Sequence, residues 1–498
     1  MPSGFEYREP MNRSTYASLP ERFFARINPT PVAMPRLLGF NRALELELGL
    51  DIGNLDAESL AALFSGNVLP AGVEPIAMAY AGHQFGHFVP QLGDGRAILL
   101  GEAQGRTGGR RDIQLKGSGR TPYSRGGDGR AALGPVLREY LVSEAMHALG
   151  VPSTRALAAV ATGESVFREE ALPGAILTRV AASFVRVGTF QYFASRGDTD
   201  AVKRLADYVI ERHYREAKTE PRPYLSLLRA VSNAQASLIA SWMHVGFIHG
   251  VMNTDNMAVS GETIDFGPCA FMDSYDPAAV FSSIDRSGRY AFGNQPHAAA
   301  WNLARLAETL LPIIDENAER AVELASETLA TFAMRLAELS LAGMRRKLGL
   351  SSREEGDAAL AEDLRQVMHR NQADFTLTFR RLCDASERDA GEDADVRRLF
   401  LNPEDFNEWA RRWRARLTRE SLQPQARAEA MRQVNPAFIP RNHRIQQVID
   451  AAVERQDLEP FAELSTVLSQ PYRYVEAFAS YADPPQPSER VLQTFCGT

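Results

Sequence analysis

The chain has 498 residues, which is too many for one ordinary hydrophobic core and enough for about two or three packed regions. Apolar residues make up 45% and charged residues 23%, which is typical of a globular chain and excludes a largely disordered one. The net charge of −7 gives no electrostatic reason to expect a nucleic acid or an anionic membrane surface as a partner.

The N-terminus and the cysteine content bear on location. Residues 1–13 mix acidic and basic side chains without an apolar centre, so they predict neither a secretory signal nor an organellar transit peptide. No run approaches the length of about 18 apolar residues that a membrane span needs. Three cysteines are too few for a disulfide framework. We therefore expect a cytoplasmic protein without a membrane partner.

Short strands are predicted in the first part of the chain, after a helical patch at 36–50. Alternating apolar residues between glycine-bearing turns indicate strands, and apolar residues three to four apart indicate a helix. The predicted elements are strands at 96–102, 112–116, 157–164 and 174–179 and a helix at 133–149.

Long helices are predicted from about Thr199 onward. The predicted elements are helices at 225–245, 296–311, 322–348 and 360–383, a β-hairpin at 257–262, an acidic solvated loop at 384–395 and an extended tail from 483. A strand-rich part followed by a helical part predicts an α+β protein of two lobes with a cleft between them.

The most informative stretch runs from His249 to Asn256 and is followed by Asp265-Phe266-Gly267. Protein kinases carry a catalytic loop His-Arg-Asp-x-x-x-x-Asn and then Asp-Phe-Gly. The spacing of His249 and Asn256 matches, yet Val251 occupies the position of the kinase base and cannot accept a proton. Asn256 and Asp265 supply oxygen ligands suited to magnesium or manganese. A chance Asp-Phe-Gly in a loop is the alternative, and the position of Asn256 upstream weakens it.

Three further elements stand in the order that a kinase-like fold needs. The turn at 93–96 contains Gly93, Gly95 and Arg96, and its backbone amides can approach phosphate oxygens, although a plain tight turn has the same composition. Lys116 ends a predicted strand and can bind phosphate, or it is an exposed lysine. Glu139 on the following helix can pair with Lys116, or it is a surface carboxylate.

Arginines are more numerous around this lysine than an ordinary kinase requires. Arg120, Arg125 and Arg130 lie in a glycine-rich loop after Lys116, and Arg179 and Arg186 follow a later strand. Such a set suits phosphate capture, although each one can equally be an exposed arginine. The surplus suggests that a triphosphate is held differently from the way a kinase holds it.

Four longer motifs resemble the selenoprotein O (YdiU) family. They are Tyr80-Ala81-Gly82-His83-Gln84-Phe85-Gly86, Gln91-Leu92-Gly93-Asp94-Gly95-Arg96, Gln114-Leu115-Lys116-Gly117-Ser118-Gly119 and His249-Gly250-Val251-Met252-Asn253-Thr254-Asp255-Asn256. The resemblance covers nearly the whole chain. It includes the C-terminal Cys496, although Gly497-Thr498 after it is a small departure from the family pattern.

The resemblance implies a bilobal protein-kinase-like fold that transfers AMP from ATP to Ser, Thr or Tyr hydroxyls of proteins. ATP in that family is bound in a flipped orientation, with the γ-phosphate deep in the pocket and the α-phosphate facing the acceptor. The resemblance implies that Asp255 is the proton acceptor, that Asn256 and Asp265 hold Mg²⁺ or Mn²⁺, and that Asp265 also contacts the nucleotide. A metal ligand or a loop-capping aspartate is the alternative for Asp255. The other nucleotide-binding residues would be Gly93, Gly95, Arg96, Lys116, Asp128, Gly129, Arg179 and Arg186.

The motifs suggest a division of the chain and a regulatory disulfide. We expect an N-terminal extension at 1–75, a nucleotide-binding N-lobe at 76–195, a helical C-lobe with the catalytic loop at 196–482, and a tail at 483–498. Cys269 follows the Asp-Phe-Gly and Cys496 lies in the tail, so a reversible disulfide between them is a hypothesis. Two unrelated thiols are the alternative. Cys383 is expected in a helix core.

Three functions stay open on these residues. The first is a protein adenylyltransferase, or a close relative that uses UTP. The second is an atypical Ser/Thr kinase with another base. The third is a non-catalytic nucleotide-binding scaffold.

Overall fold

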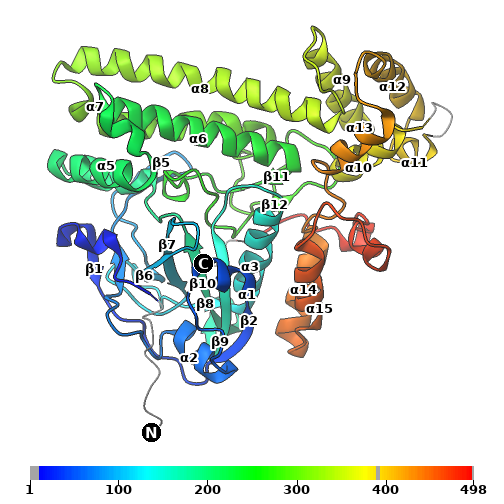
Figure 1. Ribbon diagram of the computed structural model, residues 1–498. Helices are drawn as coiled ribbons and strands as arrows, with labels where there is room; N and C mark the ends of the chain where they lie inside the picture. Colours follow the sequence, from blue (N-terminus) through cyan, green and yellow to red (C-terminus); the bar gives the residue numbers. More distant parts are fainter. Residues whose placement is uncertain (1–10, 389–392, 496–498) are drawn as a thin grey trace.

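The computed structural model describes residues 11–388 and 393–495 (Figure 1). An antiparallel sheet occupies the N-terminal half, and the C-terminal half is mostly helical. The expected α+β class is therefore confirmed. No helix in these two ranges is long and apolar enough to cross a membrane.

The sheet has eight strands, in the order β1-β3-β6-β7-β10-β9-β2, with β8 paired to β10. Each predicted strand lies within or overlaps one of them. The bounds are β1 Phe24–Arg26, β2 Arg36–Phe40, β3 Ile76–Met78, β6 Ala97–Gln104, β7 Arg110–Lys116, β8 Ala131–Ala132, β9 Arg155–Phe167 and β10 Ala171–Ala181. Residues from the expected N-terminal extension supply the strands β1 and β2 at the two ends of this order.

Side chains alternate between the two faces of the sheet along each strand. Apolar side chains stand on both faces, and helices cover each of them. On β10, Leu177 packs in the core that contains α3 (Leu133–Ala148), whereas Ile176 and Val180 pack in a second core. The second core lies under α1 (Arg42–Leu48) and α2 (Ala57–Ser65). The helix predicted at 133–149 is thus confirmed as α3, which covers the face of the sheet that carries Leu177.

Long helices form the other half and lie side by side above the sheet in Figure 1. They are α6 (Pro223–Val245), α7 (Gln295–Ile314) and α8 (Ala318–Lys347), and they confirm the helices predicted there. Gly246 caps the C-terminus of α6, and its left-handed φ of 73° suits a glycine. In chain order, α4 (Val187–Ala194) and α5 (Thr199–His213) come before α6.

Two predicted helices are wrong in extent. The patch at 36–50 is a strand and a helix, β2 and α1, because residues 36–40 pair with β9 and the Asn41 side chain then caps α1 by accepting from the Leu44 amide. The helix at 360–383 is broken into α9 (Asp357–Arg370) and α10 (Phe375–Ala385). The break follows from Asp374, which caps α10 by accepting from the Leu377 amide.

The hairpin predicted at 257–262 is also wrong. The Gly261 amide donates to the Ala258 carbonyl and closes a turn, but Ala258 bridges Arg186 and Thr263 bridges Ser153, so the residues beside the turn pair with distant parts of the chain and not with each other. The predicted acidic loop at 384–395 contains the first residues of a short helix, α11 (Ala394–Arg397), while 389–392 lie outside the described residues.

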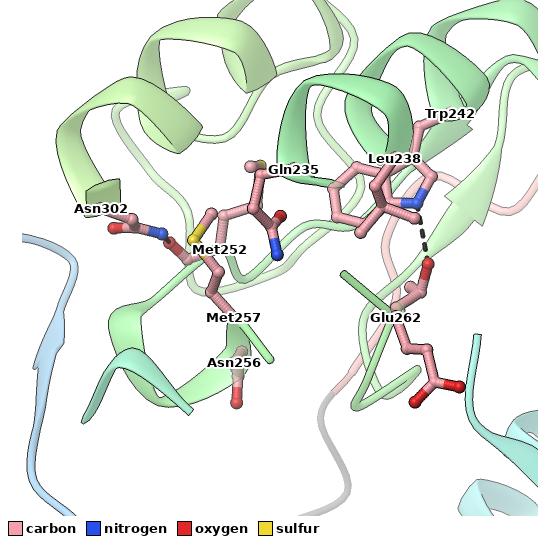
Figure 2. A pocket seen from close by; sticks show the side chains of 9 residues that line it. Gln235, Leu238, Trp242, Met252, Asn256, Met257, Glu262 and Asn302 are labelled. Atoms are coloured by element: carbon pink, nitrogen blue, oxygen red, sulfur yellow. Dashed lines mark hydrogen bonds between the residues drawn. The ribbon is translucent and has the colours of Figure 1, made fainter. Parts of the chain in front are cut away.

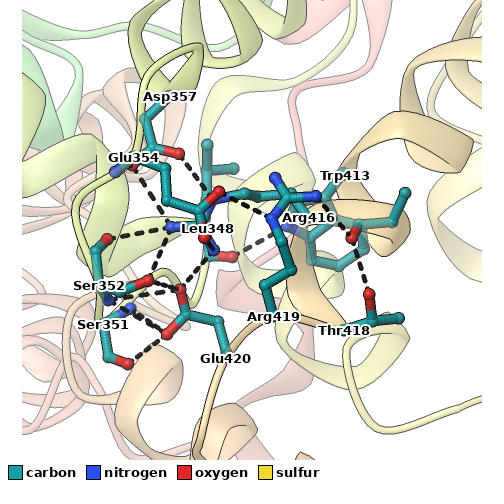
Figure 3. A network of polar contacts seen from close by, with 11 residues as sticks. Leu348, Ser351, Ser352, Glu354, Asp357, Trp413, Arg416, Thr418, Arg419 and Glu420 are labelled. Carbon is teal, nitrogen blue, oxygen red and sulfur yellow. Dashed lines mark hydrogen bonds and ion pairs between the residues drawn. The ribbon is translucent and has the colours of Figure 1, made fainter.

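The C-terminal helices are held together by polar networks as well as by apolar cores. They are α12 (Pro403–Leu417), α13 (Pro424–Arg432), α14 (Asn442–Arg455) and α15 (Glu459–Leu468). At the end of α12, the buried Arg416 contacts Asp357 and Glu420 at 2.8 and 2.6 Å, and Glu420 in turn accepts from Ser352 (Figure 3). This network joins α9 to α12 through charged groups that satisfy one another.

The tail returns to the segment that follows Asp265-Phe266-Gly267. Thr494 donates to the carbonyl of Pro268 at 2.6 Å and forms a parallel bridge with Ser282. Cys496 lies outside the described residues. Its pairing with Cys269 therefore stays a prediction.

Candidate active site

A cleft of about 770 Å³ is lined by residues of the sheet, of the loop after Lys116 and of the segment 251–268. Every residue that is expected to bind nucleotide or metal or to accept a proton lines this cleft. They are Gly93, Gly95, Arg96, Lys116, Asp128, Gly129, Arg179, Arg186, Asp255, Asn256 and Asp265. The structure thus brings together positions that are up to about 170 residues apart in the chain.

Lys116 and Glu139 form a buried ion pair. Lys116 lies on β7 and Glu139 on α3, and the Lys116 Nζ lies 2.5 Å from the Glu139 Oε2. They are 8% and 2% exposed, so the alternatives of a surface lysine and a surface carboxylate are excluded. Arg179 of β10 donates to the other Glu139 oxygen. Burial raises the pKa of Glu139, but Arg179 and Lys116 outweigh it and hold this pKa below its ordinary value.

Asp265 is surrounded by cations. Its carboxylate lies 2.5 Å from Arg179, 3.2 Å from Arg186 and 3.8 Å from Lys116. Burial raises the pKa of Asp265, but these cations, Arg179 foremost, hold it well below its ordinary value. Its φ of 64° is left-handed, which is uncommon for a residue other than glycine and is a feature of functional loops. The Asp265 side chain is therefore an ionised carboxylate held toward the cleft.

Asp255 differs from Asp265 in the contacts of its oxygens. Its Oδ2 accepts from the Gln84 amide at 3.2 Å, whereas its buried Oδ1 has no hydrogen-bond partner among the residues that the structure describes. Burial raises the pKa of Asp255 to about 6. Val251, at the kinase-base position, is buried and apolar. The only carboxylate of this loop that faces the cleft is therefore Asp255.

Asn256 and Asp265 fit a divalent cation that also binds a nucleotide. The Asn256 Nδ2 donates to the Val251 carbonyl at 3.0 Å, which leaves its oxygen as the remaining polar atom. Within 11–388 and 393–495, no cluster of three or more His, Cys, Asp or Glu residues suits a metal. Mg²⁺ is usually bound through one or two protein oxygens plus phosphate oxygens and water, so a two-residue donor set is sufficient when a triphosphate is present.

The glycines of the cleft are required by close packing within the fold. A Cβ on Gly93 would lie 2.4 Å from the Tyr123 ring, and a Cβ on Gly129 would lie 2.0 Å from the Gly119 carbonyl. Both have left-handed φ angles, of 77° and 69°. Tight packing thus explains these glycines by itself, and their part in phosphate binding stays a prediction.

The arginines of the glycine-rich loop separate into two kinds. Arg130 donates to the carbonyls of Thr30 and Pro31 and pairs with Glu164 at 3.3 Å, so it holds the loop to the sheet. Arg120 and Arg125 are exposed residues that line the cleft. Asp128 pairs with Arg168 at 2.8 Å, which ties this loop to the end of β9.

A small cavity of about 10 Å³ is lined by Asn256 and by side chains of α6 and α7 (Figure 2). Side chains of α6 and α7 hold the catalytic loop there: Gln235 donates to the Ala258 carbonyl at 2.8 Å and Asn302 to the Met252 carbonyl at 2.9 Å. The position of Asn256 is therefore set by hydrogen bonds from the long helices.

A family model described as "Protein adenylyltransferase SelO" matches residues 9–469. The chain belongs to this family. A protein of Bradyrhizobium sp. (strain BTAi1 / ATCC BAA-1182) called "Protein nucleotidyltransferase YdiU" is 63% identical over 486 residues, which cover 98% of this chain and 99% of that protein. Proteins with the same name from Rhizobium rhizogenes (strain K84 / ATCC BAA-868) and Rhizobium meliloti (strain 1021) are 62% and 61% identical, covering 97% of this chain and 96% and 99% of theirs.

Two residues that line the cleft, Asp94 and Gln84, make contacts that the sequence did not predict. Asp94 is 2% exposed, accepts from the Met78 amide at 3.1 Å and from Gln114, and lies 3.9 Å from Arg186. Gln84 holds the Asp255 carboxylate. Both stand inside the family motifs, which is the one signal that could have singled them out; their partners come from distant strands and loops.

Cys269 of this SelO-family chain is buried, and its Sγ donates to the Phe266 carbonyl at 3.1 Å. Burial raises the pKa of its thiol to about 12. In this conformation the thiol is protonated and hence a poor nucleophile. Cys383 is buried in the core around α10, as expected.

Proposed function

We propose that this protein adenylyltransferase moves the AMP group of ATP onto Ser, Thr or Tyr hydroxyls of proteins and releases pyrophosphate. The observation that carries the proposal is the replacement of the kinase base by the apolar Val251 beside a second carboxylate, Asp255, with a buried oxygen that has no hydrogen-bond partner among the described residues. The names of the relatives, protein nucleotidyltransferases, support the same class of reaction.

The scaffold we propose is a bilobal protein-kinase-like fold. The order of a strand lysine, a helix glutamate paired with it, a catalytic loop and an Asp-Phe-Gly supports this proposal. Its parts are the N-terminal extension at 1–75, the N-lobe at 76–195, the C-lobe at 196–482 and the tail at 483–498. We propose a cytoplasmic location, which the low cysteine content supports.

The cations of the cleft bind the triphosphate. Lys116, Arg179 and Arg186 lie around Asp265 and supply positive charge at one place. With the β- and γ-phosphates against these cations, the negative charge that develops on the departing pyrophosphate is stabilised. Asn256 and Asp265 would hold Mg²⁺ or Mn²⁺, which when bound supplies Lewis-acid polarisation of the phosphate oxygens.

Asp255 accepts the proton of the acceptor hydroxyl. As the hydroxyl oxygen forms its bond to the α-phosphorus, the bond from that phosphorus to the bridging oxygen of the β-phosphate breaks. The proton moves to the Asp255 carboxylate, and pyrophosphate carries away the negative charge. A pKa of about 6 leaves most of the carboxyl ionised at neutral pH and makes it a stronger base than an ordinary aspartate.

ATP labelled at the α- or the γ-phosphate tests the proposal, with a protein lysate and the enzyme itself as acceptors. We expect label on protein from the α position only. Label from γ only would indicate an atypical kinase, and label from neither would indicate a non-catalytic scaffold. The same assay with UTP compares UMP transfer with AMP transfer, and an Asp265→Ala variant that kept full labelling would contradict the metal assignment.

The disulfide between Cys269 and Cys496 is proposed as a separate redox control. Its support is the bond between Thr494 and the carbonyl of Pro268, which brings the end of the described tail next to Cys269. Alkylation after mild oxidation tests it: we expect both thiols to be protected, and if both remain alkylatable, the pairing is wrong.

A further inference from the structure

A cationic and aromatic patch lies beside the catalytic loop. We define it as Arg289, Trp301 and Arg305. The guanidinium carbons of Arg289 and Arg305 each lie 4.8 Å from the centre of the Trp301 ring, so the indole contacts two cations. All three side chains are half-buried, which holds them in place while leaving part of each in contact with solvent.

The patch adjoins the hairpin that contacts Asp255. This hairpin consists of β4 (Gly82–Gln84) and β5 (His87–Val89). A Cβ on Gly86, in its turn, would lie 3.6 Å from the Arg289 guanidinium, and the His83 ring lies 5.1 Å from the Trp301 ring. The next residue after His83 is Gln84, whose amide holds the Asp255 carboxylate.

A second chain of contacts leads from the patch to the same loop. Tyr290, next to Arg289, donates to the Asn253 side chain at 2.8 Å, and the Phe85 amide donates to the same Asn253 oxygen. Gln84, Phe85, Asn253 and Asp255 all line the cleft. The patch is therefore joined to the Asp255 end of the cleft by direct contacts.

The charge of the patch is incompletely compensated. Arg305 pairs with Glu308 at 2.5 Å, whereas Arg289 forms no ion pair with a carboxylate in the part of the chain that the structure describes. The Arg289 Nε is buried and has no hydrogen-bond partner there either. In a chain of net charge −7, an uncompensated guanidinium beside an active site favours a carboxylate brought by another molecule.

We infer that this patch docks an acidic side chain of the acceptor protein, close in sequence to the hydroxyl that receives AMP. The inference rests on the proposed function, because it assigns the Asp255 end of the cleft to the acceptor. Arginine and tryptophan are among the residues that contribute most to protein interfaces, and a guanidinium packed over an aromatic ring loses little entropy when it binds a carboxylate.

Binding of two fluorescent peptides tests the inference with the full-length protein. Both carry a central serine; one has glutamates around it and the other has lysines at the same positions. At low ionic strength we expect the acidic peptide to bind about tenfold more tightly, the effect of one charge-assisted contact. We expect Arg289→Gln to remove most of this difference and added salt to reduce it.

Charge reversal keeps the test decisive if the neutral variant folds poorly. Arg289→Glu should invert the preference, so that the lysine peptide binds more tightly, and Arg412→Gln, an exposed arginine of α12, should leave it unchanged. Equal binding of the two peptides by the unaltered protein, including no binding of either, overturns the inference, as does an acidic preference that survives Arg289→Glu. If the preference for the acidic peptide is intact but no label from the α-phosphate of ATP is transferred to protein, only the proposed function is contradicted.

Discussion

At the scale of single residues, the two aspartates of the catalytic segment have opposite environments. Asp265 lies among Arg179, Arg186 and Lys116, which hold its pKa well below the ordinary value, whereas burial raises the pKa of Asp255 to about 6. Two carboxylates whose environments push their pKa values apart are suited to two different roles. The ionised Asp265 suits cation binding, and the more basic Asp255 suits proton transfer.

Replacing Asp255 with asparagine removes the proposed proton acceptor but keeps the shape of the side chain. We expect kcat for AMP transfer to fall by about 100-fold or more, which is the usual contribution of a general base. The KM for ATP should change little, because the proposed phosphate-binding groups are Lys116, Arg179 and Arg186 and not Asp255. Steady-state kinetics measure both, with Asp207→Asn, an exposed aspartate of α5, as the control. A variant with unchanged kcat would exclude Asp255 as the base.

Glu139 compensates two buried cations, Lys116 and Arg179. Because Glu139→Gln leaves both without their shared carboxylate, we expect the free energy of unfolding to fall by about 3–5 kcal/mol. Chemical denaturation measures this loss, with the exposed Glu58→Gln as a control that should change it little. Saturating ATP should restore part of the lost stability in Glu139→Gln, because the triphosphate then supplies negative charge. Equal stability of the two variants would contradict a central role for the pair.

At the scale of secondary-structure elements, periodicity predicted the long helices and the central strands correctly. It was wrong where a short polar side chain or a distant partner decides the conformation. Asp374 ends one apolar run by capping a new helix, and the pairing of 36–40 with β9 overrides a helical pattern. The lining of the cleft was identified through motifs, whereas the contacts of Gln84 and Asp94 depend on elements far away in sequence.

Packing between α6 and α8 depends on a glycine. A Cβ on Gly343 of α8 would lie 1.9 Å from the His244 ring of α6. The His244 Nε2 donates to the Ser340 carbonyl at 3.0 Å, which holds the ring in place. Gly343→Ala should therefore lower the melting temperature: the overpacking cost of about 1–3 kcal/mol exceeds the gain in helix propensity of about 1 kcal/mol. Calorimetry checks this, with Glu338→Ala on the exposed face of α8 as the control. A rise in melting temperature would show that His244 moves aside freely.

At the scale of the whole molecule, a buried arginine connects the segment after Asp265-Phe266-Gly267 to the C-terminal helices. Arg441, 1% exposed, lies 2.6 Å from Asp273 and 2.8 Å from Asp374, and it donates to the Ala482 carbonyl at 3.0 Å. Asp273 lies shortly after the segment 251–268 that lines the cleft, Asp374 caps α10, and Ala482 precedes the tail. One guanidinium thus joins the chain that leaves the cleft to α10 and to the start of the tail.

Arg441→Met would leave the buried carboxylate of Asp374 and the half-buried one of Asp273 without a cation. We expect a loss of about 3–5 kcal/mol in the free energy of unfolding and a lower kcat, because the segment after Gly267 loses an anchor. Chemical denaturation and AMP-transfer kinetics measure the two effects. Arg455→Met, on an exposed residue of the same helix α14, is the matched control and should preserve both. If Arg441→Met is destabilised but transfers AMP with unchanged kinetics, Arg441 contributes to stability and not to activity.

The central claim is that the cleft transfers the nucleotide of ATP and not its terminal phosphate. Mass spectrometry of the acceptor proteins after incubation with unlabelled ATP tests it most directly, because the added mass identifies the transferred group. The account predicts an adenylyl group on Ser, Thr or Tyr side chains, absent when Asp255→Asn or Asp265→Ala replaces the unaltered enzyme. A phosphoryl group on the same side chains, or adenylylation that persists in both variants, would contradict it.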